Sequence, residues 1–181
     1  MHKDALETFI DAVRSDWGPL STEVVAACSR HLGALLRAPA TEPWLAELHR
    51  DRPAGRELYR DPDHGFVLLA HTEPEGLYRP PHDHGRSWVI YGVQAGQSEM
   101  GTYGRLEKAD GTPCLVKRNA TPVGPGEVQA YLPGDTHDTR CTAGPALLFR
   151  FTERDLKVED KVEHRVTRYV DRGGAWTVGE P

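Results

Sequence analysis

The chain has 181 residues, a length that one domain can fill with a buried core and without disulfide bonds. It carries 22 Lys and Arg residues against 27 Asp and Glu residues, a formal net charge of -5, and the basic residues are scattered along the sequence. Because no basic stripe could neutralise a row of phosphates, nucleic acid is excluded as an expected partner, and we look for one site on one domain.

The N-terminal residues and the cysteines indicate the compartment. Residues 1–10 carry charges and lack the apolar run of a signal peptide, and no later stretch reaches the roughly 18 apolar residues that a membrane span needs. The three cysteines, Cys28, Cys114 and Cys141, form no C-x-x-C pair. We therefore expect a cytoplasmic protein with no membrane partner and no thiolate zinc site.

Three helices are expected in the first third of the chain. Apolar residues recur at three- and four-residue spacing over residues 4–17 and again over 22–37, where Ser21 is the expected N-cap. A shorter helix is expected to begin near Pro43, with Thr41 as its cap.

From Glu57 onward the pattern changes to short apolar runs separated by Gly, Pro and Asp. Such runs predict strands, and many strands without intervening helices favour an antiparallel barrel or jelly roll, because parallel connections need a dozen or more residues. We also expect one more strand over 161–170 and a frayed end over 173–181. The expected strands are 66–70, 87–93, 114–117, 127–132 and 146–151. The chain is thus predicted to be mainly β, a single domain over 1–181 with a helical segment over 1–50 packed on a β-barrel over 56–170.

Two short segments carry histidines at a spacing that could bind a metal ion. His82 and His84 lie two positions apart in PPHDHG, and on a strand residues i and i+2 point to the same face. His137 follows the turn PGDT at the start of a later strand, from which a third imidazole could converge on the first two. A lone His-x-His pair is more often structural. Its combination with the later turn and His137, in this order on a β-rich chain, favours a metal site. Imidazole suits iron, zinc, copper and nickel, whereas magnesium and calcium prefer oxygen ligands.

Other chemically active residues are not expected to belong to this site. Asp83 lies between the two histidines and should point to the opposite face, and Cys141 is expected to be a buried structural cysteine. The remaining histidines have no spaced partners, and of these His71 is the one to watch. They are His2, His31, His49, His64, His71 and His164.

The two histidine segments resemble the two sequence motifs of the cupin superfamily. GLYRPPHDH over residues 76–84 is similar to the first motif, and residues 126–137, which end in PGDTH, are similar to the second. The resemblance implies a double-stranded β-helix, or jelly-roll barrel, with a metal ion inside its mouth. The first motif usually has a glutamate four or five residues after its second histidine, where this chain has Trp88 and Val89. A site of three histidines remains.

Among cupins, a three-histidine site resembles that of the thiol dioxygenases of the cysteine dioxygenase and 3-mercaptopropionate dioxygenase type, which implies ferrous iron. The similarity covers about residues 56–151. Arg56 stands where that family places the arginine that pairs with the substrate carboxylate, a task that a bidentate guanidinium suits.

The chain also departs from the thiol dioxygenases. Val89 stands where the animal enzymes have the cysteine of a cysteine–tyrosine cross-link, and Leu148, Arg150 and Thr152 stand where the family has a Ser, His and Tyr relay. This difference bears on the substrate more than on the metal. Arg150 could hold an anionic group if it points inward. Candidate pocket residues on the strand after His84 are Arg86, Trp88 and Tyr91.

The leading hypothesis is therefore an iron-dependent dioxygenase that uses O2 to oxidise a small carboxylated thiol to a sulfinic acid. Zinc and nickel are ions that the purified protein could also carry. The alternatives are a three-histidine dioxygenase that cleaves a carbon–carbon bond in a diketone, a zinc hydrolase or lyase, and a metal-binding sensor without catalysis. The expected partners are a small-molecule substrate and O2, and a homodimer is left open.

Overall fold

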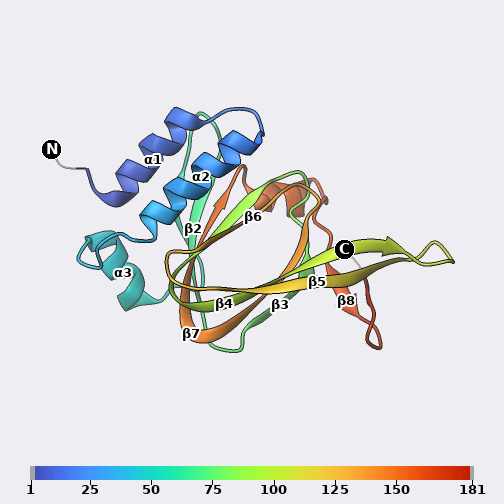
Figure 1. The fold of residues 1–181 in the computed structure, drawn as a ribbon. Coiled ribbons are helices and arrows are strands. Elements are labelled where there is room, and N and C mark those ends of the chain that lie inside the picture. The colour runs from blue at the N-terminus through green and yellow to red at the C-terminus, as the bar shows by residue number, and fades with distance from the viewer. Residues whose placement is uncertain (1–2, 180–181) are drawn as a thin grey trace.

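The first third of the chain folds into three helices that lie on one side of the molecule (Figure 1). The computed structural model describes residues 3–179, so His2 lies outside the described residues. The helices are α1 (Ala5–Asp16), α2 (Thr22–Leu35) and α3 (Pro43–Asp51). None of the helices in this part of the chain is long and apolar enough to cross a membrane.

Two of the three helix starts follow from capping residues. The Asp4 carboxylate and the Ser21 hydroxyl each accept a hydrogen bond from a backbone N–H in the first turn of α1 and α2. The expected cap at Thr41 is wrong, because Glu42 occupies the N-cap of α3 and makes no side-chain capping bond. The helix begins at Pro43, whose fixed φ suits a first turn and whose missing N–H costs nothing there.

Most of the remaining chain forms one seven-stranded antiparallel sheet, with strand order β1-β2-β7-β4-β5 and with β3 paired to β7 and β6 paired to β4. A short π-helix, η1 (Val158–Val162), precedes a separate hairpin of β8 and β9. The strands are β1 (Arg56–Arg60), β2 (Val67–Glu73), β3 (Tyr78–His82), β4 (Val89–Glu107), β5 (Pro113–Val123), β6 (Val128–Tyr131), β7 (Thr136–Thr152), β8 (Tyr169–Asp171) and β9 (Trp176–Val178).

The two longest strands, β4 and β7, close this sheet into a barrel. The first residues of β4 pair with β6 and with the end of β7, whereas the last residues of β4 pair with β5 and with the start of β7. The register shifts three times between Val93 and Ser98, where the strand bends. Each long strand therefore contributes to both halves of the jelly roll, and the expected mainly β fold with helices packed on it is confirmed.

The sequence pattern missed several strands and misplaced the C-terminal one. It gave no strand for β1, and it gave only the apolar runs of β4, β5 and β7, because most of the remaining residues of these strands are polar or small. The expected strand over 161–170 is wrong, since η1 and an irregular segment occupy most of this range. The expected fraying over 173–181 is also wrong for Trp176–Val178, which pairs with β8, while residues 180–181 lie outside the described part.

The helices pack on the outer face of the barrel through the largest apolar cluster of the protein. Alternate residues at the start of β4 and the end of β7 point toward the helices, and Trp88, Ile90, Phe149 and Phe151 are all at most 1% exposed. The intervening residues of the same strands point into the barrel.

Gly92 allows α2 to approach this wall closely. A Cβ atom at this position would lie 2.6 Å from Cδ1 of Leu36, which no ordinary contact permits. The backbone of β4 beside the site is thus pressed directly against a helix.

Candidate metal centre and its pocket

His82 and His84 reach the barrel interior from a strand end and the loop that follows it. His82 is the last residue of β3, and His84 lies in the loop before β4, so the expectation that both stand on one strand is only half right. Pro80 and Pro81 suit β3, because they lie where the register with β7 shifts between Arg79 and His82 and have no partner in that pairing. The His82 Nδ1 atom lies 2.8 Å from the Pro80 carbonyl oxygen. Donation of the Nδ1 hydrogen to this carbonyl would leave the Nε2 lone pair free to bind an ion.

His137 meets these two histidines from β7. It stands directly opposite His82 in the strand pairing, and its ring centroid lies 4.7 Å from that of His82 and 4.9 Å from that of His84. The Nε2 atoms of His84 and His137 are 3.3 Å apart, and one ligand atom from each of the three residues lies within 4.8 Å of the others. The structure therefore brings together the three side chains that the sequence singled out.

Burial keeps these rings neutral, as metal binding requires. The pKa values of His84 and His137 lie well below the ordinary histidine value, chiefly because burial disfavours the charged ring and secondly because His82 is close. The pKa of His82 is also lowered by burial. Neutral imidazoles present a lone pair instead of a proton near neutral pH.

The donor set of this cluster fits one transition-metal ion. It contains three imidazoles and neither a carboxylate nor a thiolate ligand among the described residues. Such a set leaves the ion its full charge and leaves coordination positions open for a reactant. The Nδ1 atoms of His84 and His137 are buried and have no hydrogen-bond partner within residues 3–179, so only His82 has an orienting contact of this kind.

Two tyrosines border the three histidines. The Tyr91 hydroxyl lies 3.2 Å from Nε2 of His84, and the Tyr131 ring stacks on His137 with centroids 3.9 Å apart. Burial raises the pKa of Tyr91, and the nearby Arg150 guanidinium opposes this shift. Of the candidate pocket residues, Tyr91 thus lies beside the cluster, and Tyr131 is a neighbour that the sequence pattern did not indicate.

A pocket of about 600 Å³ opens beside the histidines, and His82, His84 and Tyr91 form part of its wall. Arg150 also lines it, from the position on β7 directly opposite Tyr91. Its Nε atom is buried without a hydrogen-bond partner, and no carboxylate within residues 3–179 forms an ion pair with it. A half-buried guanidinium without a counter-ion is a natural ligand for an anion.

His71 also lines the pocket, from β2. Its Nδ1 atom lies 3.1 Å from the Ala54 carbonyl oxygen, and its Nε2 atom is buried without a partner in the described chain. Burial, followed by the charge of Arg150, lowers its pKa to about 4. Histidine spacing could not indicate a role for His71, because β2 contributes only one histidine.

Three expected substrate residues lie elsewhere. Arg56 does not line the pocket and instead pairs with Asp51, with 3.0 Å between Nη2 and Oδ2. Arg86 is exposed in the loop after His84, also outside the pocket wall. Trp88 is 1% exposed and belongs to the cluster beneath the helices. Because side chains alternate along a strand, Trp88 and Tyr91 could not both face the same side.

The side chains first set aside keep structural roles. Cys28 and Cys141 are buried, and burial raises the pKa of each thiol, to about 12 for Cys28. Outside the pocket, His31 pairs with Asp16 at 2.8 Å. The other described histidines away from the pocket are exposed: His49, His64 and His164.

A segment near the C-terminus, residues 154–170, covers one side of the pocket and is called the strap below. The Asp83 carboxylate accepts a hydrogen bond from the Thr167 backbone N–H at 2.9 Å, which fixes one end of the strap to the loop between His82 and His84. Asp83 therefore points away from the metal cluster, as expected.

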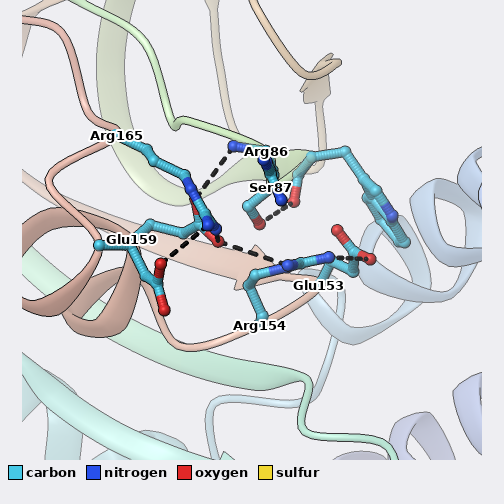
Figure 2. A network of polar contacts seen from close by, with 8 residues as sticks. Arg86, Ser87, Glu153, Arg154, Glu159 and Arg165 are labelled. Atoms are coloured by element: carbon cyan, nitrogen blue, oxygen red, sulfur yellow. Dashed lines mark hydrogen bonds and ion pairs between the residues drawn. The ribbon is translucent and has the colours of Figure 1, made fainter.

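Another attachment of the strap is Glu159, a carboxylate on η1 that is 1% exposed (Figure 2). It accepts the Arg86 backbone N–H at 3.1 Å and contacts the guanidinium groups of Arg154 at 3.4 Å and Arg165 at 3.7 Å. Gly85 makes room for it, since a Cβ atom there would lie 2.6 Å from the carboxylate and the φ angle is +62°.

Comparison with known proteins found only distant structural similarities. Neither a protein-family model nor a curated protein sequence matches the chain. Among solved structures, a protein from Bacillus halodurans is similar at 15% identity and a TM-score of 0.48, over 64% of this chain and 81% of that one. The cupin domain of Schizosaccharomyces pombe Cnp3 is similar at 11% identity and a TM-score of 0.44, over 60% and 69%. An uncharacterised Klebsiella pneumoniae protein with a double-stranded β-helix domain is similar at 14% identity and a TM-score of 0.39, over 53% and 66%.

The fold is a mainly antiparallel β-barrel of the jelly-roll type with N-terminal helices packed on it. Inside it lies a buried three-histidine cluster that could bind a metal ion.

Proposed function

We propose that this protein is an iron-dependent dioxygenase that oxidises a carboxylated thiol to the corresponding sulfinic acid. The observation that carries the proposal is the arrangement of two groups in one pocket: three neutral imidazoles that converge, and the Arg150 guanidinium without a counter-ion. The first group would hold the ion, and the second would hold the charged end of the reactant.

The three histidines would hold Fe(II), which when bound supplies a Lewis-acidic site and an electron path between the thiol and O2. In the overall reaction both oxygen atoms are transferred to sulfur, so that sulfur loses four electrons and O2 gains four. No additional reductant is needed.

The chain's own residues would orient the reactant and restrict water. Arg150 would bind the carboxylate by a charge-assisted pair, which fixes one end of the molecule relative to the histidines. Leu148 lines the same wall two positions earlier on β7 and is 2% exposed, so it offers an apolar surface beside the reacting end. The Tyr91 hydroxyl, next to His84, would donate a hydrogen bond to a group at the centre.

The position of Arg150 favours an anionic reactant over a neutral diketone. Leu148, Arg150 and Thr152 all line the pocket, so the positions of the family relay do face inward, but they carry different side chains. An arginine in this relay suits anion binding better than proton transfer, because guanidinium remains protonated. The carboxylate role expected of Arg56 is therefore reassigned to Arg150 in this proposal.

The proposal is tested by oxygen uptake. Metal-free protein is loaded with Fe(II) under anaerobic conditions, oxygen is added, and uptake is followed with 3-mercaptopropionate, cysteine and acetylacetone. We expect uptake with a thiol, a sulfinic acid product, and loss of both in a His137→Ala variant but not in a His49→Ala variant. Uptake only with acetylacetone would replace thiol oxidation by carbon–carbon cleavage, and iron binding without any uptake would favour a sensor.

Zinc chemistry is separated from iron chemistry by the same preparations. Protein loaded with Zn(II) should take up no oxygen with any thiol, because zinc has no accessible redox change. Hydrolytic activity that appears with zinc and not with iron would overturn the dioxygenase proposal.

A further inference from the structure

The pocket is larger than a three-carbon thiol acid requires. Its volume of about 600 Å³ lies within the range of about 300–1,000 Å³ that is typical of sites for drug-sized ligands. A reactant as small as cysteine would leave most of this space to water. Since burial of the ligand surface provides most of the affinity in such sites, the size itself indicates a larger ligand.

The pocket wall carries further aliphatic side chains that the proposed reaction does not use. They come from three parts of the chain: the sheet, the turn before β3 and the strap. Leu156, on the strap, is partly buried and packs against the cluster that contains Leu148 and Tyr91. These aliphatic residues include Leu69, Leu77, Leu156 and Val166.

Most of the charged side chains around the pocket are paired, and Arg150 is a half-buried guanidinium without a counter-ion in the described chain. The buried Asp83 carboxylate accepts the backbone N–H groups of Gly85 and Thr167. Arg79 contacts Glu73 at 2.8 Å, and Arg168 makes two hydrogen bonds to the Asp160 carboxylate, at 2.6 and 2.9 Å. Arg60 contacts Asp155 at 2.9 Å and also pairs with Glu57. Lys161 lies 3.5 Å from Asp160, and Lys157 is exposed at the rim. The interior of the pocket therefore offers one free positive group, not two.

From these observations we infer that the natural ligand is a monoanionic acid with an apolar body, such as an aliphatic acid of roughly six to ten carbons. Its charged end binds Arg150, and its apolar part lies along the aliphatic wall beneath the strap. This inference rests on the proposed function only in assuming that the pocket holds the reactant.

The inference is tested by binding to metal-free protein, where catalysis plays no part. Calorimetric titrations compare propionate, hexanoate and octanoate with octanol, which lacks the charge, and with suberate, which has a second one. We expect affinity to rise by up to roughly fourfold for each added methylene, the value of a buried CH2 group. Octanol and suberate should bind at least about tenfold more weakly than octanoate, because one leaves Arg150 unpaired and the other buries a second charge.

Two matched variants locate the ligand. Leu156→Ala should lower octanoate affinity by about tenfold and leave propionate affinity unchanged, because it removes part of the wall that only the longer acid reaches. Val162→Ala serves as the control on the same strap, since Val162 is 67% exposed and does not line the pocket. Arg150→Gln should weaken all the carboxylates and leave octanol unchanged. Equal affinity along the acid series would overturn the inference. Unchanged octanoate affinity in Leu156→Ala, when the melting curve of this variant matches that of the parent protein, would also overturn it.

A parallel experiment separates this inference from the dioxygenase proposal. Oxygen uptake by the iron-loaded protein is compared for 3-mercaptopropionate and 3-mercaptooctanoate, which have the thiol at the same distance from the carboxylate and differ in the aliphatic tail. Preferential uptake with the longer thiol supports both proposals. Binding that depends on chain length, without oxygen uptake with either thiol, would support the ligand class and overturn the dioxygenase proposal. Oxygen uptake with the short thiol, without a binding preference for longer acids, would support the dioxygenase proposal and overturn the ligand class.

Discussion

Alternate residues along β4 and β7, and Trp88 just before β4, point to two faces of the barrel wall that differ in chemistry. Trp88 and Phe151 point outward to the helices in a dry apolar layer, whereas Tyr91 and Arg150 point inward and border the histidine cluster. The outer layer provides apolar burial, and the inner face contains polar atoms that lack partners, including Nε of Arg150. The comparison shows that stability and chemistry can be placed on one strand because side chains alternate.

The largest expected effect belongs to the outer face. Trp88→Ala should lower the free energy of unfolding by about 3–5 kcal/mol, because it empties a large volume beneath the helices. In the fraction that remains folded, the metal stoichiometry should be unchanged. Chemical denaturation of the metal-free protein measures the first effect, and Leu106→Ala, at a side chain that is 54% exposed, is the control. A loss below about 1 kcal/mol would contradict the assignment of stability to this layer.

On the inner face, His137→Ala should lower metal affinity by at least about 100-fold, since loss of an outer-shell partner alone costs about 10–100-fold. The far-ultraviolet circular dichroism of the variant should remain that of the parent protein. Competition with a chelator measures the affinity, with His49→Ala as the control. Unchanged affinity in His137→Ala would place the ion elsewhere.

His71 should make the inner face sensitive to acid. Its pKa is about 4 in the folded protein against an ordinary value of 6.5, so between these values the unfolded chain takes up a proton that the folded chain does not. The free energy of unfolding should therefore fall as the pH falls from about 6.5 to about 4, and this contribution is fully lost below that range. In His71→Gln the slope should decrease by up to about 1.4 kcal/mol per pH unit. Denaturation of metal-free protein at several pH values checks this, and a slope identical to that of the parent would show that His71 is protonated in the folded state.

The smallest effect is expected at Arg56, which belongs to neither face. Arg56→Ala removes an ion pair with Asp51 in which both side chains are more than a third exposed, so stability should change by less than about 1 kcal/mol. Binding of carboxylates should be unchanged, in contrast to Arg150→Gln. A loss of carboxylate binding in Arg56→Ala would restore the role that the sequence resemblance gave to this residue.

Several features of the site could be read from the sequence because they depend on local order. The spacing of His82 and His84, and the turn that precedes His137, are set by the covalent chain, and their similarity to two known motifs gave the barrel and the ligand set. Helix starts at Asp4 and Ser21 follow from capping within one turn.

Other features depended on contacts between distant residues. Only the pairing of β7 with β2 and β4 turns Arg150 inward, and only the position of α3 turns Arg56 toward Asp51. Trp88 was expected in the pocket because it lies near His84 in sequence. The expectation failed because residues that are close in sequence need not share one face of a strand. The strap could not be foreseen either, since the Glu159 and Asp83 carboxylates that attach it accept hydrogen bonds from backbone N–H groups that are 73 and 84 positions away in sequence.

The sequence by itself determined the mainly β fold class, the three histidines and the presence of Trp88 and Val89 where the resembled motif has a glutamate, because these follow from residue identity and short-range spacing. Only the tertiary structure decided which charged and apolar side chains border the histidines. That choice depends on strand register, on which face each residue occupies and on which charges find partners. None of these is fixed until the barrel closes.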